Sequence, residues 1–297
     1  MFKGSFTALV TPFKNGKIDE ATFERFVEWQ IAEGTHGLVP VGTTGEAPTL
    51  SHDEHRRIVE LCVKAAKKRV PVIAGAGSNS TEEAIELTKF AKKAGASAAL
   101  HSTGYYNKPT QEGLFLHFKA ISDAVDLPII VYNVPGRAVV DILPATLARM
   151  AKLKNVKGVK DASAKVERMS QHRLLIGTDF SYLTGEDATA LGFNAHGGTG
   201  AISVTSNVAP RLCSEFQAAC LKGDWKRALE IQDLLMPLHD ALFVETSPAP
   251  VKYAAWRLGM IESQDCRLPL APLTEATKKV VDAAMAHAGL LKAKAAE

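Results

Sequence analysis

The sequence has few cysteines, no long apolar run and no marked excess of either charge. Its 297 residues include 4 cysteines, and these lack the CxxC spacing that zinc sites and small disulfide frameworks use. No stretch approaches the roughly 18 consecutive apolar residues that a membrane-spanning helix needs. We therefore expect no metal, no disulfide framework and no contact with a membrane.

Charge is nearly balanced, with 35 Lys and Arg residues against 32 Asp and Glu residues and a net charge of +3. Basic residues are interspersed with acidic ones, so they form no stripe that could follow a phosphate backbone. Nucleic acid is therefore not an expected partner. The first five residues lack the charged and then apolar layout of a secretory signal, and we expect a cytoplasmic protein.

Hydrophobic residues, by contrast, are ample at 46%, and they occur in short β-type runs that alternate with helical stretches. The predicted strands lie near residues 6–11, 37–41, 70–74, 97–100, 128–132, 156–160, 174–176 and 197–202. Such hydrophobic strands, each returning through a helix, indicate a parallel sheet buried on both faces. Eight of them indicate a (β/α)₈ TIM barrel. A doubly wound open sheet is the alternative, although no GxGxxG motif opens the first unit.

Capping residues mark helix starts, and the spacing of a capping box occurs at Ser51 with Glu54 and at Ser80 with Glu83. Beyond the eighth unit the strands stop. Helices are predicted there at residues 225–244, 248–259 and 274–291. We therefore expect a catalytic barrel over residues 1–223 and a C-terminal helical domain over residues 224–297, whose last six residues fray.

Residues 155–163 contain the first candidate catalytic residue. They are predicted to form a strand, and its period of two places Val156, Gly158 and Lys160 on one face. A lysine that faces a barrel interior is desolvated, which favours the neutral amine that can attack a carbonyl carbon and form a Schiff base. The alternative is a solvated or carboxylate-paired lysine at the mouth of the strand.

Three further loops place polar or aromatic residues after predicted strands, where barrels of this kind carry their sites. The loop 42–46 offers two threonine hydroxyls and several N–H groups that suit a small carboxylate. Tyr132 could transfer protons, and Arg137 could hold a carboxylate through two parallel hydrogen bonds. Tyr105 and Tyr106 follow the fourth strand. Each motif alone also fits a turn, a rim aromatic or a surface ion pair.

In order and spacing, four motifs together resemble the pyruvate-dependent family of N-acetylneuraminate lyase and dihydrodipicolinate synthase. They are GTTGE at 42–46, YYNKP at 105–109, YNVPGR at 132–137 and VK at 159–160. The resemblance covers essentially the whole chain. It implies a lyase of class I aldolase type that condenses pyruvate with L-aspartate 4-semialdehyde to 4-hydroxy-tetrahydrodipicolinate, in lysine and diaminopimelate biosynthesis. It also implies a homotetramer that needs no cofactor.

The resemblance further implies a role for each site residue. The expected catalytic residues are Lys160, which would form the Schiff base, and Tyr132, Thr44 and Tyr106, which would relay protons, with Tyr106 coming from a neighbouring subunit. The expected substrate-binding residues are Thr43 and Thr44 for the pyruvate carboxylate, Arg137 for the aldehyde carboxylate, and Gly185 and Ile202 through their backbone. The expected site for lysine as a feedback inhibitor comprises His52, His55, Ser78, Asn79, Glu83 and Tyr105.

Two stretches depart from the family pattern. Residues 101–104 read His-Ser-Thr-Gly where an apolar pair, Thr and Pro are usual, and Ala138 and Val139 replace a Thr-Gly pair. Both stretches adjoin expected substrate contacts. They leave open a second hypothesis, in which a pyruvate-dependent aldolase or 2-keto-acid dehydratase acts on a different aldehyde. A third hypothesis, from another class, is an inactive barrel that only binds a small amino acid or keto acid.

Histidines raise two narrower alternatives. His101 is either a new acid/base group or a polar filler of the barrel wall. His52 and His55 could pair on a metal, but HExxH spacing and a third ligand are missing.

Overall fold

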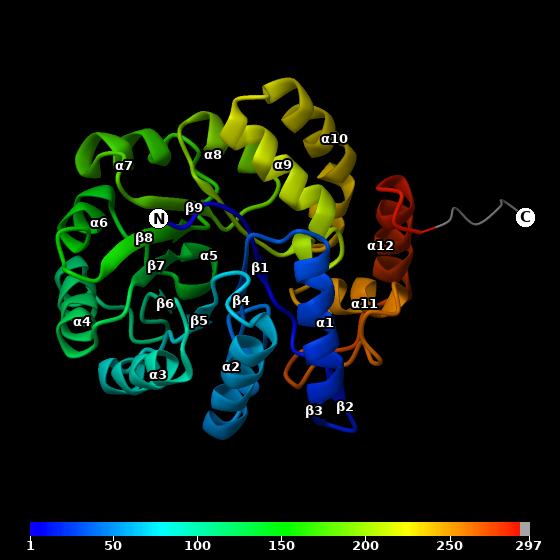
Figure 1. The fold of residues 1–297 in the computed structure, drawn as a ribbon, viewed down its shortest axis with the longest axis horizontal. Helices are drawn as coiled ribbons and strands as arrows, with labels where there is room; N and C mark the ends of the chain where they lie inside the picture. Colours follow the sequence, from blue (N-terminus) through cyan, green and yellow to red (C-terminus); the bar gives the residue numbers. More distant parts are fainter. Residues whose placement is uncertain (292–297) are drawn as a thin grey trace, which may run out of the picture.

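An eight-stranded parallel barrel forms the centre of the computed structural model, which describes residues 1–291 (Figure 1). The end of the chain that is predicted to fray, residues 292–297, lies outside the described residues. The strands are β1 (Gly4–Ala8), β4 (Gly37–Val39), β5 (Ile73–Gly75), β6 (Ala98–Ser102), β7 (Ile129–Asn133), β8 (Val156–Asp161), β9 (Ser181–Thr184) and β10 (Gly200–Ser203). They pair in the order β4-β1-β10-β9-β8-β7-β6-β5, and a parallel bridge between Leu38 and Val72 brings the two ends of the sheet together.

Helices follow the strands and cover the outside of the barrel. They are α1 (Glu20–Ala32), α2 (His52–Ala66), α3 (Thr81–Ala94), α4 (Gln111–Ala124), α6 (Pro144–Met150), α7 (Arg168–Ile176), α8 (Ala190–Ala195) and α9 (Pro210–Lys222). Shorter elements lie in the connections: the hairpin β2 (Phe13–Lys14) and β3 (Lys17–Ile18), helix α5 (Pro135–Ala138), and the 3₁₀ turns η1 (Ala47–Thr49) and η2 (Thr205–Asn207). The predicted (β/α)₈ fold is thereby confirmed.

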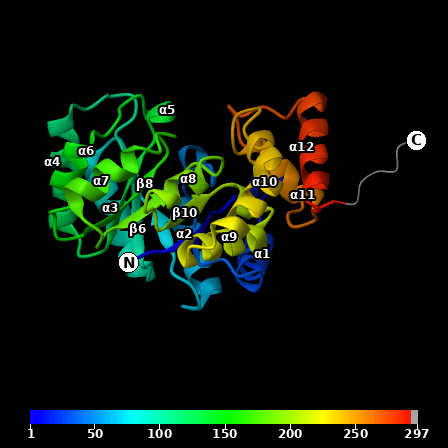
Figure 2. The same cartoon turned by 90° about the horizontal axis from the view of Figure 1, so that it is seen from above.

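Three more helices form the C-terminal part: α10 (Trp225–Ala241), α11 (Ala249–Arg257) and α12 (Glu275–His287). Figures 1 and 2 show α11 and α12 at one side of the molecule, while α4, α6 and α7 lie at the other. This helical part confirms the predicted appendage. Among the described residues, no helix is long and apolar enough to cross a membrane.

Of the two predicted capping boxes, only the one at the start of α2 forms completely. At the start of α2, the Ser51 hydroxyl accepts from the Glu54 N–H at 3.2 Å, and the Glu54 carboxylate accepts from the Ser51 N–H at 2.9 Å. At the start of α3, the Ser80 hydroxyl accepts from the Glu83 N–H at 3.4 Å. The Glu83 carboxylate, however, accepts from the Ser78 hydroxyl. The second box is therefore only half formed, because Glu83 has a different partner.

The predicted strand at residues 174–176 is wrong. Leu174 and Leu175 belong to the last turn of α7, which ends at Gly177 with a φ of 97°. The strand of this unit is β9, whose four residues are buried, whereas Leu174 is 86% exposed. A run of three apolar residues cannot by itself distinguish a helix end from a strand.

The prediction that Val156 shares a face with Gly158 and Lys160 is wrong, because β8 contains an extra residue. Ile129 pairs with Val156, but Ile130 pairs with Gly158, so the strand bulges at Lys157. Val156 consequently packs in the apolar layer between the sheet and the helices. A Cβ on Gly158 would touch the Ile130 side chain, which lies in the barrel interior. A bulge shifts the alternation by one position, and Lys160 therefore still shares the interior face with Gly158.

A buried ion pair joins the barrel to its C-terminal helices. Lys252 Nζ on α11 lies 2.8 Å from Glu46 Oε1, and the two side chains are 0% and 2% exposed. Glu46 Oε2 accepts from the Arg267 N–H at 2.8 Å, and Lys252 Nζ lies 4.2 Å from the Phe13 ring centroid. Because Glu46 ends the loop 42–46, the C-terminal part holds one end of that loop.

We expect Lys252→Ala to lower the free energy of unfolding by about 3–5 kcal/mol, because Glu46 would keep a buried charge without its cation. Urea unfolding followed by circular dichroism measures the loss. Glu275→Ala is the control, since it breaks an ion pair with Lys278 in which Glu275 is 82% exposed, and such pairs contribute about 0–1 kcal/mol. Equal losses in the two variants would contradict the prediction.

Candidate active site

A cavity of about 430 Å³ lies among the loops that follow the carboxyl ends of β4, β5, β6 and β7. This is the end of the barrel where sites of such folds are built. The expected site residues that line it are Thr43, Tyr132 and Arg137, together with His52, His55, Glu83 and Tyr105 of the expected lysine site. One cavity therefore contains residues of both expected sites.

Lys160 and Tyr132 form the centre of the expected reaction site. They are paired in register on the neighbouring strands β8 and β7, and they are 6% and 7% exposed. Lys160 Nζ lies 4.1 Å from the centroid of the Tyr132 ring. An amine in such an apolar, water-poor place is suited to attack a carbonyl carbon. Ile202, fully buried on β10, contributes to the same barrel interior.

Gly185 makes room for the Lys160 side chain. Its N–H donates to the Asp161 carbonyl at 2.7 Å, which fixes the loop after β9 next to the end of β8. A Cβ on Gly185 would lie 2.8 Å from Lys160 Cε and 2.9 Å from the Cβ of Ala162. The Lys160 side chain therefore needs a residue without a side chain at position 185.

The loop 42–46 is a tight turn that presents Thr43 to the cavity. The Gly45 N–H donates to the Gly42 carbonyl at 3.1 Å, and the Thr11 hydroxyl donates to the Gly45 carbonyl at 2.8 Å. Thr44, the next residue, is buried with 4% exposure. The barrel therefore holds the loop through Thr11, and the C-terminal part holds it through Glu46.

Tyr106 does not line the cavity of this chain. Its side chain is 93% exposed and its φ is 68°. Its neighbour Tyr105 does line the cavity, and the Tyr105 carbonyl accepts from the Asn79 side chain at 3.3 Å. Within one chain, the expected proton relay therefore lacks Tyr106.

The charges of Arg137 and Glu186 interact at the rim of the barrel. Arg137, on α5, donates from Nη2 to the Ser247 carbonyl at 3.2 Å, in the connection between α10 and α11. Burial, reinforced by Asp187, raises the pKa of Glu186, while the charges of Lys160 and Arg137 oppose the rise. The sequence reasoning missed Glu186. Its signal was a carboxylate just after a strand, and the misplaced strand at 174–176 concealed it.

The expected lysine-binding residues form a second cluster around Glu83. His52 Nε2 lies 3.3 Å from Glu83 Oε1, and the buried Ser78 hydroxyl donates to the same carboxylate. Burial lowers the pKa of His55 to about 4, so this imidazole is neutral at pH 7. Within residues 1–291, no group of three His, Cys, Asp or Glu side chains is arranged to hold a metal.

Residues 101–104 differ in what they contribute. His101 is fully buried, with Nε2 at 3.0 Å from the Thr88 hydroxyl and its ring edge-on to Phe118. Burial lowers its pKa to about 3, and it does not line the cavity, so it acts as a filler of the wall. Ser102 and Thr103 do line the cavity, and Thr103 Oγ1 is buried without a hydrogen-bond partner among the described residues.

A buried lysine inside a (β/α)₈ barrel, beside a strand-end tyrosine that lines a cavity, is typical of the class of Schiff-base-forming lyases. Comparison with known proteins specifies the family. Residues 1–288 match the Dihydrodipicolinate synthetase family, and the chain belongs to it.

Its relatives are similar over nearly their whole length. The 4-hydroxy-tetrahydrodipicolinate synthase of Parvibaculum lavamentivorans is 67% identical over 98% of this chain and 100% of its own. The chloride-inhibited dihydrodipicolinate synthase from Acinetobacter baumannii, crystallised with pyruvate, is 45% identical with a TM-score of 0.96, covering 98% of this chain and 100% of that one. The enzyme from Cyanidioschyzon merolae with lysine bound is 36% identical with a TM-score of 0.94, covering 98% and 99%. These findings confirm the predicted family and its enzymatic function.

We expect Gly185→Ala to lower kcat/KM for pyruvate by about tenfold or more, because the new methyl group displaces the Lys160 side chain from its working position. Steady-state kinetics measure the change, and the thermal midpoint should also fall, because the new Cβ crowds the Cβ of Ala162 at 2.9 Å. Gly136→Ala is the matched control, since a Cβ there meets nothing within 4 Å. Unimpaired pyruvate kinetics in Gly185→Ala would refute the steric argument.

Proposed function

We propose that this chain condenses pyruvate with L-aspartate 4-semialdehyde to 4-hydroxy-tetrahydrodipicolinate, through a Schiff base on Lys160, in lysine and diaminopimelate biosynthesis. The observation that carries the proposal is the place of Lys160: it is 6% exposed, inside the barrel, with its amine 4.1 Å from the Tyr132 ring centroid. The synthase names of its relatives support the same reaction.

The reaction follows from amine chemistry. The Lys160 amine attacks C2 of pyruvate, and water leaves to give a protonated imine. The imine withdraws electrons from the methyl group, which loses a proton and becomes an enamine carbon. That carbon attacks the aldehyde of the second substrate. The substrate's own amine then attacks C2, closes the ring and releases Lys160 unchanged. Tyr132, Thr44 and a neighbouring subunit's Tyr106 carry the protons.

Substrate binding divides between two loops. Thr43 and Thr44 hold the pyruvate carboxylate through the donors of the tight turn 42–46, and Gly185 and Ile202 contribute backbone. Arg137, which lines the cavity, pairs with the carboxylate of the aldehyde. An arginine here favours an acidic aldehyde.

The assembly and location that we propose are those expected from the sequence. The exposure of Tyr106 fits a tetramer in which tyrosines are exchanged between tight dimers. The barrel comprises residues 1–223, the helical domain begins at residue 224, and the enzyme works in the cytoplasm.

Borohydride reduction in the presence of pyruvate tests the function. Peptide mass mapping should find a reduced pyruvate adduct on Lys160, and aspartate semialdehyde should diminish it by turning the intermediate over. Lys160→Ala should show neither adduct nor activity. An adduct that the aldehyde leaves untouched would assign a different acceptor, and the absence of any adduct would favour the barrel that only binds.

Lysine is the inhibitor that we propose for the outer part of the cavity. The Glu83 carboxylate suits an ammonium group, and it is held from two sides by His52 and Ser78. Pro48 also lines this region. The enzyme from Cyanidioschyzon merolae is a relative whose crystal structure contains bound lysine.

We expect Glu83→Gln to raise the lysine concentration for half-inhibition by about tenfold or more, because a charged partner of the ammonium group is lost. Turnover without lysine should stay within about twofold of the parent. Glu86→Gln, on the same helix and paired with Lys89 at the surface, is the control. Inhibition that is unchanged in Glu83→Gln would place the lysine site elsewhere.

A further inference from the structure

The loop that carries Arg137 contains a strained residue. Val139 has a φ of 66°, and its side chain is 68% exposed, so side-chain packing does not impose this conformation. A β-branched residue rarely adopts positive φ, and such strain persists only where the surrounding structure determines it. Something outside Val139 must therefore hold the loop.

Asp141 and Asn133 close the loop at its base. The Asn133 side-chain amide donates to Asp141 Oδ1 at 2.9 Å, and its oxygen accepts from the Ile142 N–H at 3.0 Å. Asn133 is the last residue of β7 and follows Tyr132. These two hydrogen bonds join both ends of a short loop with Arg137 near its middle.

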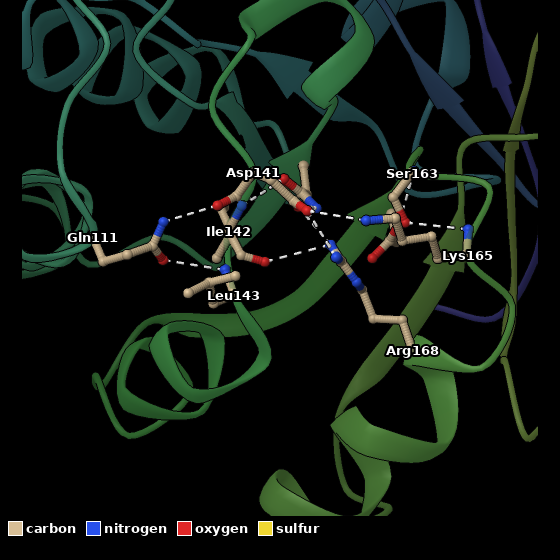
Figure 3. Close-up of polar contacts among 9 residues, drawn as sticks. Gln111, Asp141, Ile142, Leu143, Ser163, Lys165 and Arg168 are labelled. Carbon is tan, nitrogen blue, oxygen red and sulfur yellow. Dashed lines mark hydrogen bonds and ion pairs between the residues drawn. The ribbon is translucent and has the colours of Figure 1, made fainter.

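Arg168 and Gln111 hold Asp141 in place, and Lys165 Nζ also lies 3.7 Å from Asp141 Oδ2. Arg168 of α7 donates to both carboxylate oxygens, at 2.5 Å and 2.7 Å, and its side chain is 7% exposed. The Arg168 guanidinium lowers the pKa of Asp141 to about 2, so the pair is charged at neutral pH. Gln111 of α4 donates to the Asp141 carbonyl at 2.8 Å and accepts from the Leu143 N–H at 3.1 Å (Figure 3).

The residues of Schiff-base formation are held differently. Tyr132 and Lys160 lie within strands β7 and β8, whose backbone ladder continues to Asn133 and Asp161. Their positions therefore do not depend on Asp141. The loop after β7, in contrast, is held at its base by side chains.

We propose that Asp141, Arg168 and Gln111 form a clamp that positions Arg137 for the aldehyde substrate and leaves pyruvate activation untouched. None of the three lines the cavity, so they are positioning residues. The inference rests on the proposed role of Arg137. Misplacing a carboxylate-binding group weakens the binding of the substrate that it orients. It has little effect on the binding of the other substrate.

The test compares Asp141→Ala, Asp141→Asn and Gln111→Ala with the parent. In Asp141→Ala, we expect KM for aspartate semialdehyde to rise by about tenfold or more. KM for pyruvate and borohydride trapping on Lys160 should stay within about twofold. Asp141→Asn keeps an oxygen that can accept from Asn133 and Arg168, and it should recover most of the loss. An equal loss for both substrates would overturn the proposal.

Gln111→Ala keeps the test decisive if Asp141→Ala does not fold, because it removes one part of the clamp and leaves no buried charge unpaired. We expect a rise of about threefold in KM for the aldehyde, and faster hydrogen exchange at the Ile142 and Leu143 amides. Gln171→Ala, at an exposed position of α7, is the matched control. Unchanged exchange or unchanged aldehyde KM in Gln111→Ala would overturn the clamp.

Arg137→Ala, measured in parallel, separates this inference from the proposed function. A raised KM for the aldehyde in Arg137→Ala but not in the clamp variants would reject the clamp alone. An unaltered KM in Arg137→Ala itself would reject the proposed role of Arg137, and the clamp's role in catalysis with it.

Discussion

The buried ion pair between Lys252 and Glu46 is the constraint on which the site depends. Two charges removed from water require each other, and this pair spans the barrel and its C-terminal helices at 2.8 Å. Glu46 is the last residue of the loop that presents Thr43 to the cavity, so the helical part shapes the loop that we propose to bind pyruvate. The contact of Arg137 with the Ser247 carbonyl extends the same dependence to the residue that we propose to bind the aldehyde. The appendage is thus a structural part of the active site.

The site separates reactivity from recognition. Lys160 and Tyr132 are held by neighbouring parallel strands, where backbone hydrogen bonds fix each side chain against an apolar interior. The loop that carries Arg137 is held at its base by the ion pair of Asp141 with Arg168 and by Gln111, which donates to the Asp141 carbonyl and accepts from the Leu143 N–H. A loop held by side chains can change without disturbing the strands. This arrangement lets one barrel retain imine chemistry while the acceptor substrate varies.

Glu83, which we propose to bind the inhibitor, lines the same cavity. Its carboxylate turns away from the capping position that its sequence spacing predicts, and accepts from the Ser78 hydroxyl beside His52. The residue therefore gives up a hydrogen bond at the start of α3 and faces the cavity that also contains Tyr132 and Arg137. A ligand at Glu83 would occupy part of the space above the reaction centre.

By itself, the sequence predicted the barrel, because hydrophobic alternation and capping spacing are local. It also predicted Lys160, Tyr132 and the loop 42–46 as the reaction centre, because these residues lie at or just after the ends of predicted strands. Local patterns misplaced the strand at 174–176, since three apolar residues fit a helix end equally well, and they could not show the bulge at Lys157. Only the tertiary structure decided which distant charges meet. Asp141 and Arg168, like Glu46 and Lys252, are far apart in the chain, and nothing in their local sequence marks them as partners. Burial selects such pairs, because an unpaired charge in the interior is too costly to keep.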